Sequence, residues 1–183
     1  MKIAYEDFSL SKADVPYIPG FLAFKEVPSY LELFDNLKKN RPELWPQLLL
    51  VDGNGIFHNR SFGCASHIGV ITGIPSIGLG KNVFAVDGMT KDSVAALSEK
   101  YLSKPGSHLD LIGKSGKTWG IALRSHVRED PLIVSQGHKI SLKTALKVFQ
   151  DCLYKQRLPE PVRLADERSR RIVKEKHDQG YIP

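Results

Sequence analysis

The stretch LLLVDGNGIFH, residues 48–58, joins a run of four apolar residues to an aspartate that is followed by two glycines. A short continuous apolar run is typical of a strand covered on both faces, so we expect a buried strand over residues 47–51. Asp52 then stands at the carboxyl end of this strand, where open α/β sheets bind their ligands. Asp-Gly is also a common turn dipeptide, so Asp52 alone does not distinguish a catalytic carboxylate from a turn residue.

Apolar runs and helical patterns alternate along the rest of the chain. Further strands are expected at residues 75–79, 119–124 and 132–135. Helices are expected where apolar or small residues recur at three- and four-residue spacing, over residues 24–37, 61–72 and 142–153. Strands that alternate with helices predict an α/β domain with a mainly parallel sheet.

Two less regular segments complete the single domain that we expect over residues 1–183. Residues 82–118 form an insertion that is polar and partly helical up to residue 110 and ends in a hairpin. Its GKSGKT sequence, residues 113–118, resembles a phosphate-binding loop, but the required glycine is leucine at position 111 and a strand pattern follows, so a turn is expected. The tail, residues 159–183, carries mixed charge and predicts one surface helix.

Composition restricts the classes of partner. The chain has 183 residues and a formal net charge of +6, which is compatible with a polyanionic partner. No apolar stretch approaches the roughly 20 residues of a membrane span, so no membrane partner is expected. The two cysteines, Cys64 and Cys152, lack metal-ligand spacing and predict reduced thiols in an intracellular protein.

Charged residues follow three of the expected strands. Asp52, Lys81 and His138 each stand at a carboxyl end, and in a parallel sheet these ends meet at one edge. The sequence therefore predicts a carboxylate, an ammonium group and an imidazole in one site. The alternative is a set of unrelated surface salt bridges.

Glu26 adds a second carboxylate to this expected site. On a helix it shares a face with Tyr30, Leu33 and Leu37, which predicts the core-facing side, where a carboxylate is costly unless it is paired or bound to metal. Alternatively, Pro28 begins the helix and leaves Glu26 exposed before it. Two carboxylates beside a lysine and a histidine in a basic protein predict a Mg²⁺ site for phosphodiester chemistry.

Four stretches resemble the endonuclease V family in order and spacing. They are PYIPGFLAFKE (residues 16–26), LLLVDGNGIFHNRSFGCASHIGVITGIPSIGLGK (48–81), PLIVSQGHKISLKTA (131–145) and LPEPVRLAD (158–166). The resemblance implies a ribonuclease H-like α/β fold with a mixed sheet flanked by helices. It also implies a hydrolase that uses Mg²⁺, with Mn²⁺ as an alternative, to cut DNA or RNA at the second phosphodiester bond 3′ to inosine, leaving 5′-phosphate ends.

The resemblance further implies where the protein acts and on what. The sequences LAFKEVP (residues 22–28) and VDGNG (residues 51–55) are similar to those of animal-type members, which favour inosine in RNA. We therefore expect a monomer that binds single-stranded RNA or DNA containing inosine, in the cytoplasm or the nucleus, including the nucleolus.

Individual residues receive roles from the resemblance. Glu26 and Asp52 match metal-binding carboxylates, and Lys81 and His138 match residues near the scissile phosphate. In the family, a wedge fills the gap left by an extruded base, and its residues correspond to Pro16, Tyr17, Ile18 and Pro19. The residues that line the family's base pocket correspond to Leu22, Gly53 and Gly55. His58 is expected near the substrate strand, and His67 is expected to be structural.

The start of the chain departs from the family pattern. Family members begin with a strand that ends in a GVD motif, whose aspartate is a further metal ligand, but residues 1–7 resemble the third strand of that meander. Missing N-terminal strands predict an unpaired edge beside the Asp52 strand, and Asp7 is not a convincing substitute ligand. We therefore expect a nuclease with impaired activity, from a short form or an incomplete gene model. The alternatives are a non-cleaving form that binds inosine-containing nucleic acid and a non-functional product.

A second departure from the family pattern is Lys25, where many members have arginine. Lysine keeps the positive charge but loses the bidentate contact that arginine can make.

Overall fold

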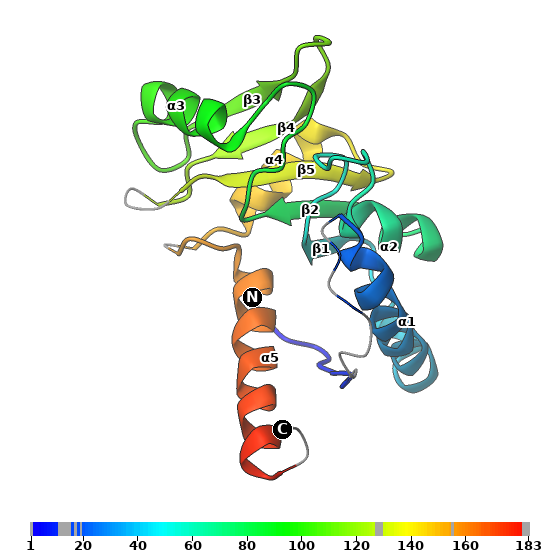
Figure 1. The fold of residues 1–183 in the computed structure, drawn as a ribbon. Helices are drawn as coiled ribbons and strands as arrows, with labels where there is room; N and C mark the ends of the chain where they lie inside the picture. The colour runs from blue at the N-terminus through cyan, green and yellow to red at the C-terminus, as the bar shows by residue number, and fades with distance from the viewer. Residues whose placement is uncertain are drawn as a thin grey trace.

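A mixed five-stranded sheet forms the centre of the protein (Figure 1). The computed structural model describes residues 2–10, 16, 18, 20–126, 130–154 and 156–180. In spatial order the strands are β1 (Leu49–Asp52), β2 (Ser76–Gly80), β5 (Leu132–His138), β4 (Thr118–Leu123) and β3 (His108–Ile112). All four strands expected from apolar runs are present, and β3 is added by the insertion.

The directions of the strands differ from the pattern-based expectation. Only β1 and β2 run parallel, whereas β2–β5, β5–β4 and β4–β3 are antiparallel. The mixed sheet implied by the family resemblance is therefore confirmed, and the mainly parallel sheet is wrong. An apolar run reports burial but not strand direction, and the tight turn after Ile112 forces an antiparallel β3–β4 pair.

Helices cover the sheet on both faces. They are α1 (Leu22–Asn40), α2 (Cys64–Thr72), α3 (Lys91–Tyr101), α4 (Leu142–Asp151) and α5 (Glu160–Asp178), with a 3₁₀ turn η1 (Pro42–Leu44) after α1. Pro28 lies inside α1, so the alternative that it begins the helix is wrong. No helix within the described ranges is both long and apolar enough to cross a membrane.

Successive side chains of the inner strands point to opposite faces of the sheet and so join two different core clusters. On β5, Ile133 belongs to a cluster with Phe57 and Val94, which lies under α3. Its neighbours Leu132 and Val134 belong to the opposite cluster, which contains Phe149 of α4 and Val162 of α5. Both faces of β5 are therefore buried, as its continuous apolar run predicts.

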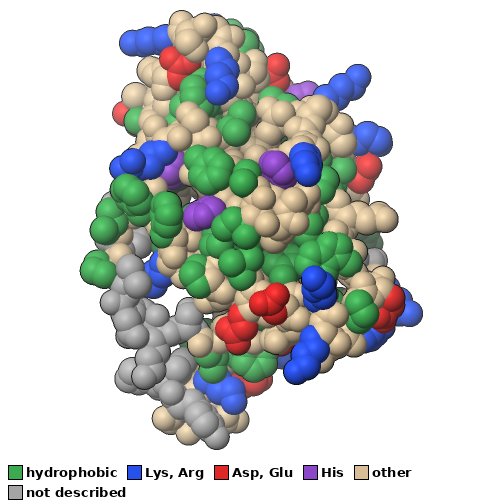
Figure 2. Space-filling view, turned by 90° about the vertical axis from the view of Figure 1, so that its right-hand side faces the viewer, with side chains coloured by type: hydrophobic (Ala, Val, Ile, Leu, Met, Phe, Trp, Pro, Cys, Tyr) green, Lys and Arg blue, Asp and Glu red, His purple; other side chains and the backbone are tan. Residues whose placement is uncertain are grey.

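Helices α1 and α2 pack together against one face of β1. Ala23 and Val27 of α1 contact Cys64 and Ile68 of α2, with Leu49 and Val51 of β1 packed beside them. Hydrophobic and histidine side chains share the outer surface on this side of the molecule (Figure 2). This arrangement places the start of α1 next to the carboxyl end of β1.

Residues 2–10 lie between α5 and α1 and form no strand (Figure 1). The expected third strand of the meander is therefore wrong for this segment. Side chains hold the segment instead, because Glu6 accepts a hydrogen bond from Arg168 at 2.7 Å and Asp7 accepts one from Asn36 at 3.1 Å. Among the described residues β1 pairs only with β2, so the expected unpaired edge is confirmed.

Candidate functional site

Asp52 and Lys81 meet at the carboxyl ends of the two parallel strands. Asp52 is the last residue of β1 and pairs in register with Leu79 of β2, two residues before Lys81. The Lys81 Nζ atom lies 2.6 Å from Asp52 Oδ2, and the two side chains are 31% and 41% exposed. The predicted meeting of these two charges is confirmed, and the pair is accessible to a ligand.

Glu26 approaches Asp52 from the first turns of α1. Burial raises the pKa of Glu26 above its ordinary value, and the nearby charge of Asp52 raises it further. Hydrogen bonds from the Cys64 thiol and the Tyr30 hydroxyl, together with the charge of Lys25, oppose this shift in pKa. Glu26 is thus a partly buried carboxylate on the side of α1 that the helical pattern predicts.

Cys64, at the start of α2, contributes a neutral thiol to this group. Burial raises the pKa of Cys64 to about 12, and the charge of Glu26 acts in the same direction. Both cysteines are free, as the sequence predicts. The contact between Cys64 and Glu26 was not predicted, because it depends on how α1 packs against α2.

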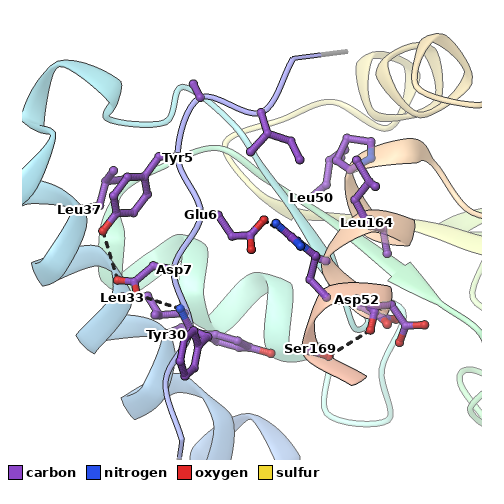
Figure 3. Close-up of a pocket in the computed structure, with 18 of the residues that line it drawn as sticks. Tyr5, Glu6, Asp7, Tyr30, Leu33, Leu37, Leu50, Asp52, Leu164 and Ser169 are labelled. Atoms are coloured by element: carbon purple, nitrogen blue, oxygen red, sulfur yellow. Dashed lines mark hydrogen bonds and ion pairs between the residues drawn. The ribbon is translucent and has the colours of Figure 1, made fainter. Parts of the chain in front are cut away.

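A cavity of about 1050 Å³ lies beside the unpaired edge of β1 (Figure 3). Residues 2–9, α1, β1 and α5 line it. Apolar side chains such as Leu33, Leu37 and Leu50 form part of the wall. Its carboxylates are Glu6, Asp7, Glu26, Asp52 and Asp166.

Asp166 is a carboxylate of the cavity that the sequence pattern does not single out. It lies on α5, where Arg170 Nε is 3.1 Å from its Oδ2 atom, and it lines the same cavity as Glu26 and Asp52. Val162 and Ser169 also face inward from α5 at helical spacing from Asp166. This spacing is visible in the sequence, but the charges around it suggested a fully solvated helix.

His138 does not join the site. It pairs in register with Ser76, at the amino end of β2, whereas Asp52 pairs with Leu79 near the carboxyl end. Because β5 runs antiparallel to β2, the carboxyl end of β5 lies beside the amino end of β2, at the other end of the strands from Asp52 and Lys81. The expectation that His138 lies with Asp52 and Lys81 is therefore wrong.

His58 is buried inside the loop after β1. Its Nδ1 atom accepts a hydrogen bond from the Arg60 backbone N–H at 3.2 Å, and its ring packs at 5.2 Å against Phe84. Burial lowers the pKa of His58, and the charge of Arg60 lowers it further. These contacts give His58 a structural role, and its expected place near the substrate strand stays a prediction.

Gly53 and Gly55 allow the same loop to pack closely on its neighbours. A Cβ atom on Gly55 would collide with the Gln136 carbonyl oxygen of β5, and one on Gly53 would lie 3.1 Å from the Cβ atom of Cys64. The Gly55 N–H also donates to Ser135 Oγ at 2.9 Å. Close packing accounts for both glycines, while their role in a base pocket stays a prediction.

Part of the expected wedge and pocket can be located. Pro16, Ile18 and Leu22 are exposed at the entry to α1. Tyr17 and Pro19 lie outside the described residues. The assignment of residues 16–19 as a wedge therefore stays a prediction.

The donors in the cavity suit a hard divalent cation. Glu26 and Asp52 are close enough for the charge of Asp52 to raise the pKa of Glu26, and Mg²⁺ is commonly bound by one or two carboxylates with waters and phosphate. No group of three or more His, Cys, Asp or Glu side chains in the described ranges is placed to hold a metal. The residues fit a cation shared with a phosphate ligand rather than one enclosed by protein.

Comparisons with known proteins find relatives over most of this chain. The family model for endonuclease V matches residues 1–167. The endonuclease V of Mus musculus is 44% identical over 175 residues, which are 95% of this chain and 52% of that protein. The chain thus spans about half the length of this curated relative.

Two solved structures have the same fold. The crystal structure of human endonuclease V superposes with a TM-score of 0.89 at 42% identity, covering 96% of this chain and 74% of that one. The endonuclease V of Ciona intestinalis, solved with a DNA 24mer that contains an inosine followed by a ribo-adenosine, gives a TM-score of 0.83 at 37% identity. That match covers 90% of this chain and 70% of the Ciona chain. The ribonuclease H-like fold is confirmed.

Proposed function

This chain belongs to the endonuclease V family, and we propose that it carries the nuclease site of a metal-dependent enzyme that cuts inosine-containing RNA or DNA. The observation that supports this proposal most is the meeting of Asp52, Lys81 and Glu26 beside an open cavity. The DNA bound to the Ciona relative supports the substrate class. We further propose cleavage at the second phosphodiester bond 3′ to inosine, with a 5′-phosphate product.

Each charged residue has a distinct task in this proposal. Glu26 and Asp52 would hold Mg²⁺ or Mn²⁺, and Asp166 faces the same cavity from α5. Such a cation, when bound, polarises a phosphoryl oxygen and lowers the pKa of a coordinated water. Lys81 holds Asp52 in place through their 2.6 Å contact and supplies positive charge where a pentavalent phosphate gathers negative charge.

Two neighbours of Glu26 stabilise its charged form. The thiol of Cys64 and the hydroxyl of Tyr30 both donate to its carboxylate, which opposes the effect of burial on its pKa. The remaining lone pairs are then free for a cation or for water.

A cleavage assay on Asp52→Ala tests the proposal. Labelled RNA and DNA oligonucleotides with one inosine are incubated with the wild-type chain and Mg²⁺, and matched adenosine oligonucleotides report selectivity. We expect Asp52→Ala to lower the cleavage rate by more than about a hundredfold, because loss of a metal ligand exceeds the effect of losing an outer partner. The matched control is Asp92→Ala, an exposed aspartate in the first turn of α3.

The outcomes separate the proposal from its rival. If Asp52→Ala cuts as fast as the wild type, the assignment of the metal site is wrong. Inosine-selective, salt-dependent binding without cleavage by the wild type would instead identify a binding module. One observation favours this second candidate, namely that no group of three metal-binding side chains occurs within the described ranges.

A further inference from the structure

Aromatic side chains gather on the outer surface where α1 meets α2, and none of them lines the cavity. Phe24 of α1 is 66% exposed, and Phe62, just before α2, is 44% exposed. Phe21, next to α1, is also exposed. We call Phe21, Phe24, Phe62 and His67 the aromatic platform.

The rings of the platform contact one another in a chain. The His67 ring lies 5.0 Å from the Phe24 ring and 5.6 Å from the Phe62 ring, so it joins the two helices. Phe24 in turn lies 5.9 Å from Phe21. The backbone N–H of His67 donates to the Gly63 carbonyl oxygen at 2.9 Å, in the first turn of α2. These contacts hold the rings in place although much of their surface is in water.

A positive charge lies on the platform. The Arg60 guanidinium carbon is 3.9 Å from the centroid of the Phe21 ring, within the range of a cation–π contact. Exposed aromatic rings interleaved with arginine are typical of surfaces that bind single-stranded nucleic acid, because each base can stack on a ring and arginine attracts the phosphates. The net charge of +6 acts in the same direction.

The platform adjoins the segment that enters α1. Gly20, in the left-handed conformation at φ +81°, lies against Asn59, since a Cβ atom there would be 3.1 Å from the Asn59 side chain. Gly20 therefore lies beside the loop that carries Arg60. A strand whose base is bound beside Gly20 would place its neighbouring nucleotides next to the platform.

We propose that the aromatic platform binds single-stranded nucleic acid by stacking the bases that flank the modified nucleotide. This proposal rests on the proposed function for the identity of the ligand, but binding by the platform requires neither cleavage nor recognition of inosine. Because every base has an aromatic face, the platform adds affinity without sequence preference. It would thus raise the affinity for inosine-containing and ordinary strands by the same factor.

Fluorescence anisotropy with a labelled single-stranded 12mer tests the platform. The probe carries either inosine or adenosine at its centre, and EDTA prevents cleavage. We expect the double variant Phe24→Ala/Phe62→Ala to bind both probes about tenfold more weakly than the wild type, equivalent to about 1.4 kcal/mol. The matched control, Tyr101→Ala, removes an exposed aromatic ring from α3 and is expected to leave both affinities unchanged.

Single substitutions of Phe24 separate stacking from simple apolar contact. Phe24→Tyr keeps an aromatic face and should bind like the wild type, whereas Phe24→Leu keeps apolar surface and should bind more weakly. The slope of log Kd against log salt concentration should stay the same in all of these variants, because no phosphate contact is removed. Since Phe24 is mostly exposed, the variants should also keep the melting temperature of the wild type.

Three results would overturn the platform. One is equal affinity of the double variant and the wild type for both probes. Another is full affinity of Phe24→Leu, which would show that apolar contact is sufficient. The third is concentration-dependent self-association of the wild type that the double variant lacks, because the surface would then bind protein. A different result separates the two proposals. If the wild type binds the inosine and adenosine probes equally well, while the double variant binds both about tenfold more weakly, the proposed function is contradicted and the platform is supported.

Discussion

Strands β1 and β2 are neighbours in one sheet, yet their surroundings differ. All five residues of β2 are buried, and β2 pairs with a strand on each side. In β1 the first three residues are only partly buried, Asp52 is exposed, and the outer edge faces the cavity. Packing at the centre of the sheet therefore supplies stability, whereas the incompletely covered edge leaves room for charged side chains and a ligand.

The largest expected effect is on the stability of the centre. Phe149 of α4 is completely buried against β2 and β5, so Phe149→Ala should lower the free energy of unfolding by about 3–5 kcal/mol. Leu33→Ala, a truncation in the wall of the cavity, should cost less than about 1.5 kcal/mol because its side chain is only partly buried. Urea unfolding measures both. Equal losses at the two positions would show that the β1 side is packed as tightly as the centre.

A smaller effect concerns the pH dependence of stability. The folded state raises the pKa of Glu26, so it retains a proton at pH values where the unfolded chain, titrating near 4.5, has lost it. Ionisation of Glu26 therefore opposes folding, and its contribution to stability falls as pH rises through the interval between these two pKa values. Glu26→Gln removes this term, so it should gain stability relative to the wild type as the pH rises above 4.5.

Urea midpoints of the two proteins across this pH range measure the difference. Glu99→Gln, an exposed glutamate on α3, serves as the matched control. A difference between Glu26→Gln and the wild type that stays constant with pH would contradict the raised pKa of Glu26. Because Glu26 is also a proposed metal ligand, the same substitution should lower activity while it raises stability.

The predictable part of the site is the part that local patterns encode. Asp52 and Lys81 each end an apolar run, and their strands pair in parallel, so the expected juxtaposition holds. The inward side of α1 follows from helical spacing, which placed Glu26 correctly although Pro28 lies within the helix.

The remaining features depend on long-range pairing that local patterns do not report. His138 was misplaced because an apolar run does not reveal that β5 is antiparallel to β2. Asp166 was missed because its position depends on how α5 docks beside β1. Residues 2–10 are expected as a strand, but this segment lies between α1 and α5 and is held there by side-chain contacts of Glu6 and Asp7 rather than by pairing with the free edge of β1.

Glu26 and Asp52 are proposed to share one cation, and Mn²⁺ binding measured by electron paramagnetic resonance tests this most directly. Titrations in the presence of an inosine-containing oligonucleotide compare the wild type with Glu26→Gln, Asp52→Asn and the double variant. We expect each single variant to bind Mn²⁺ at least about tenfold more weakly, and the double variant to lose little more, because both carboxylates serve one site. Wild-type affinity for Mn²⁺ in either single variant would contradict a shared metal site at the edge of β1.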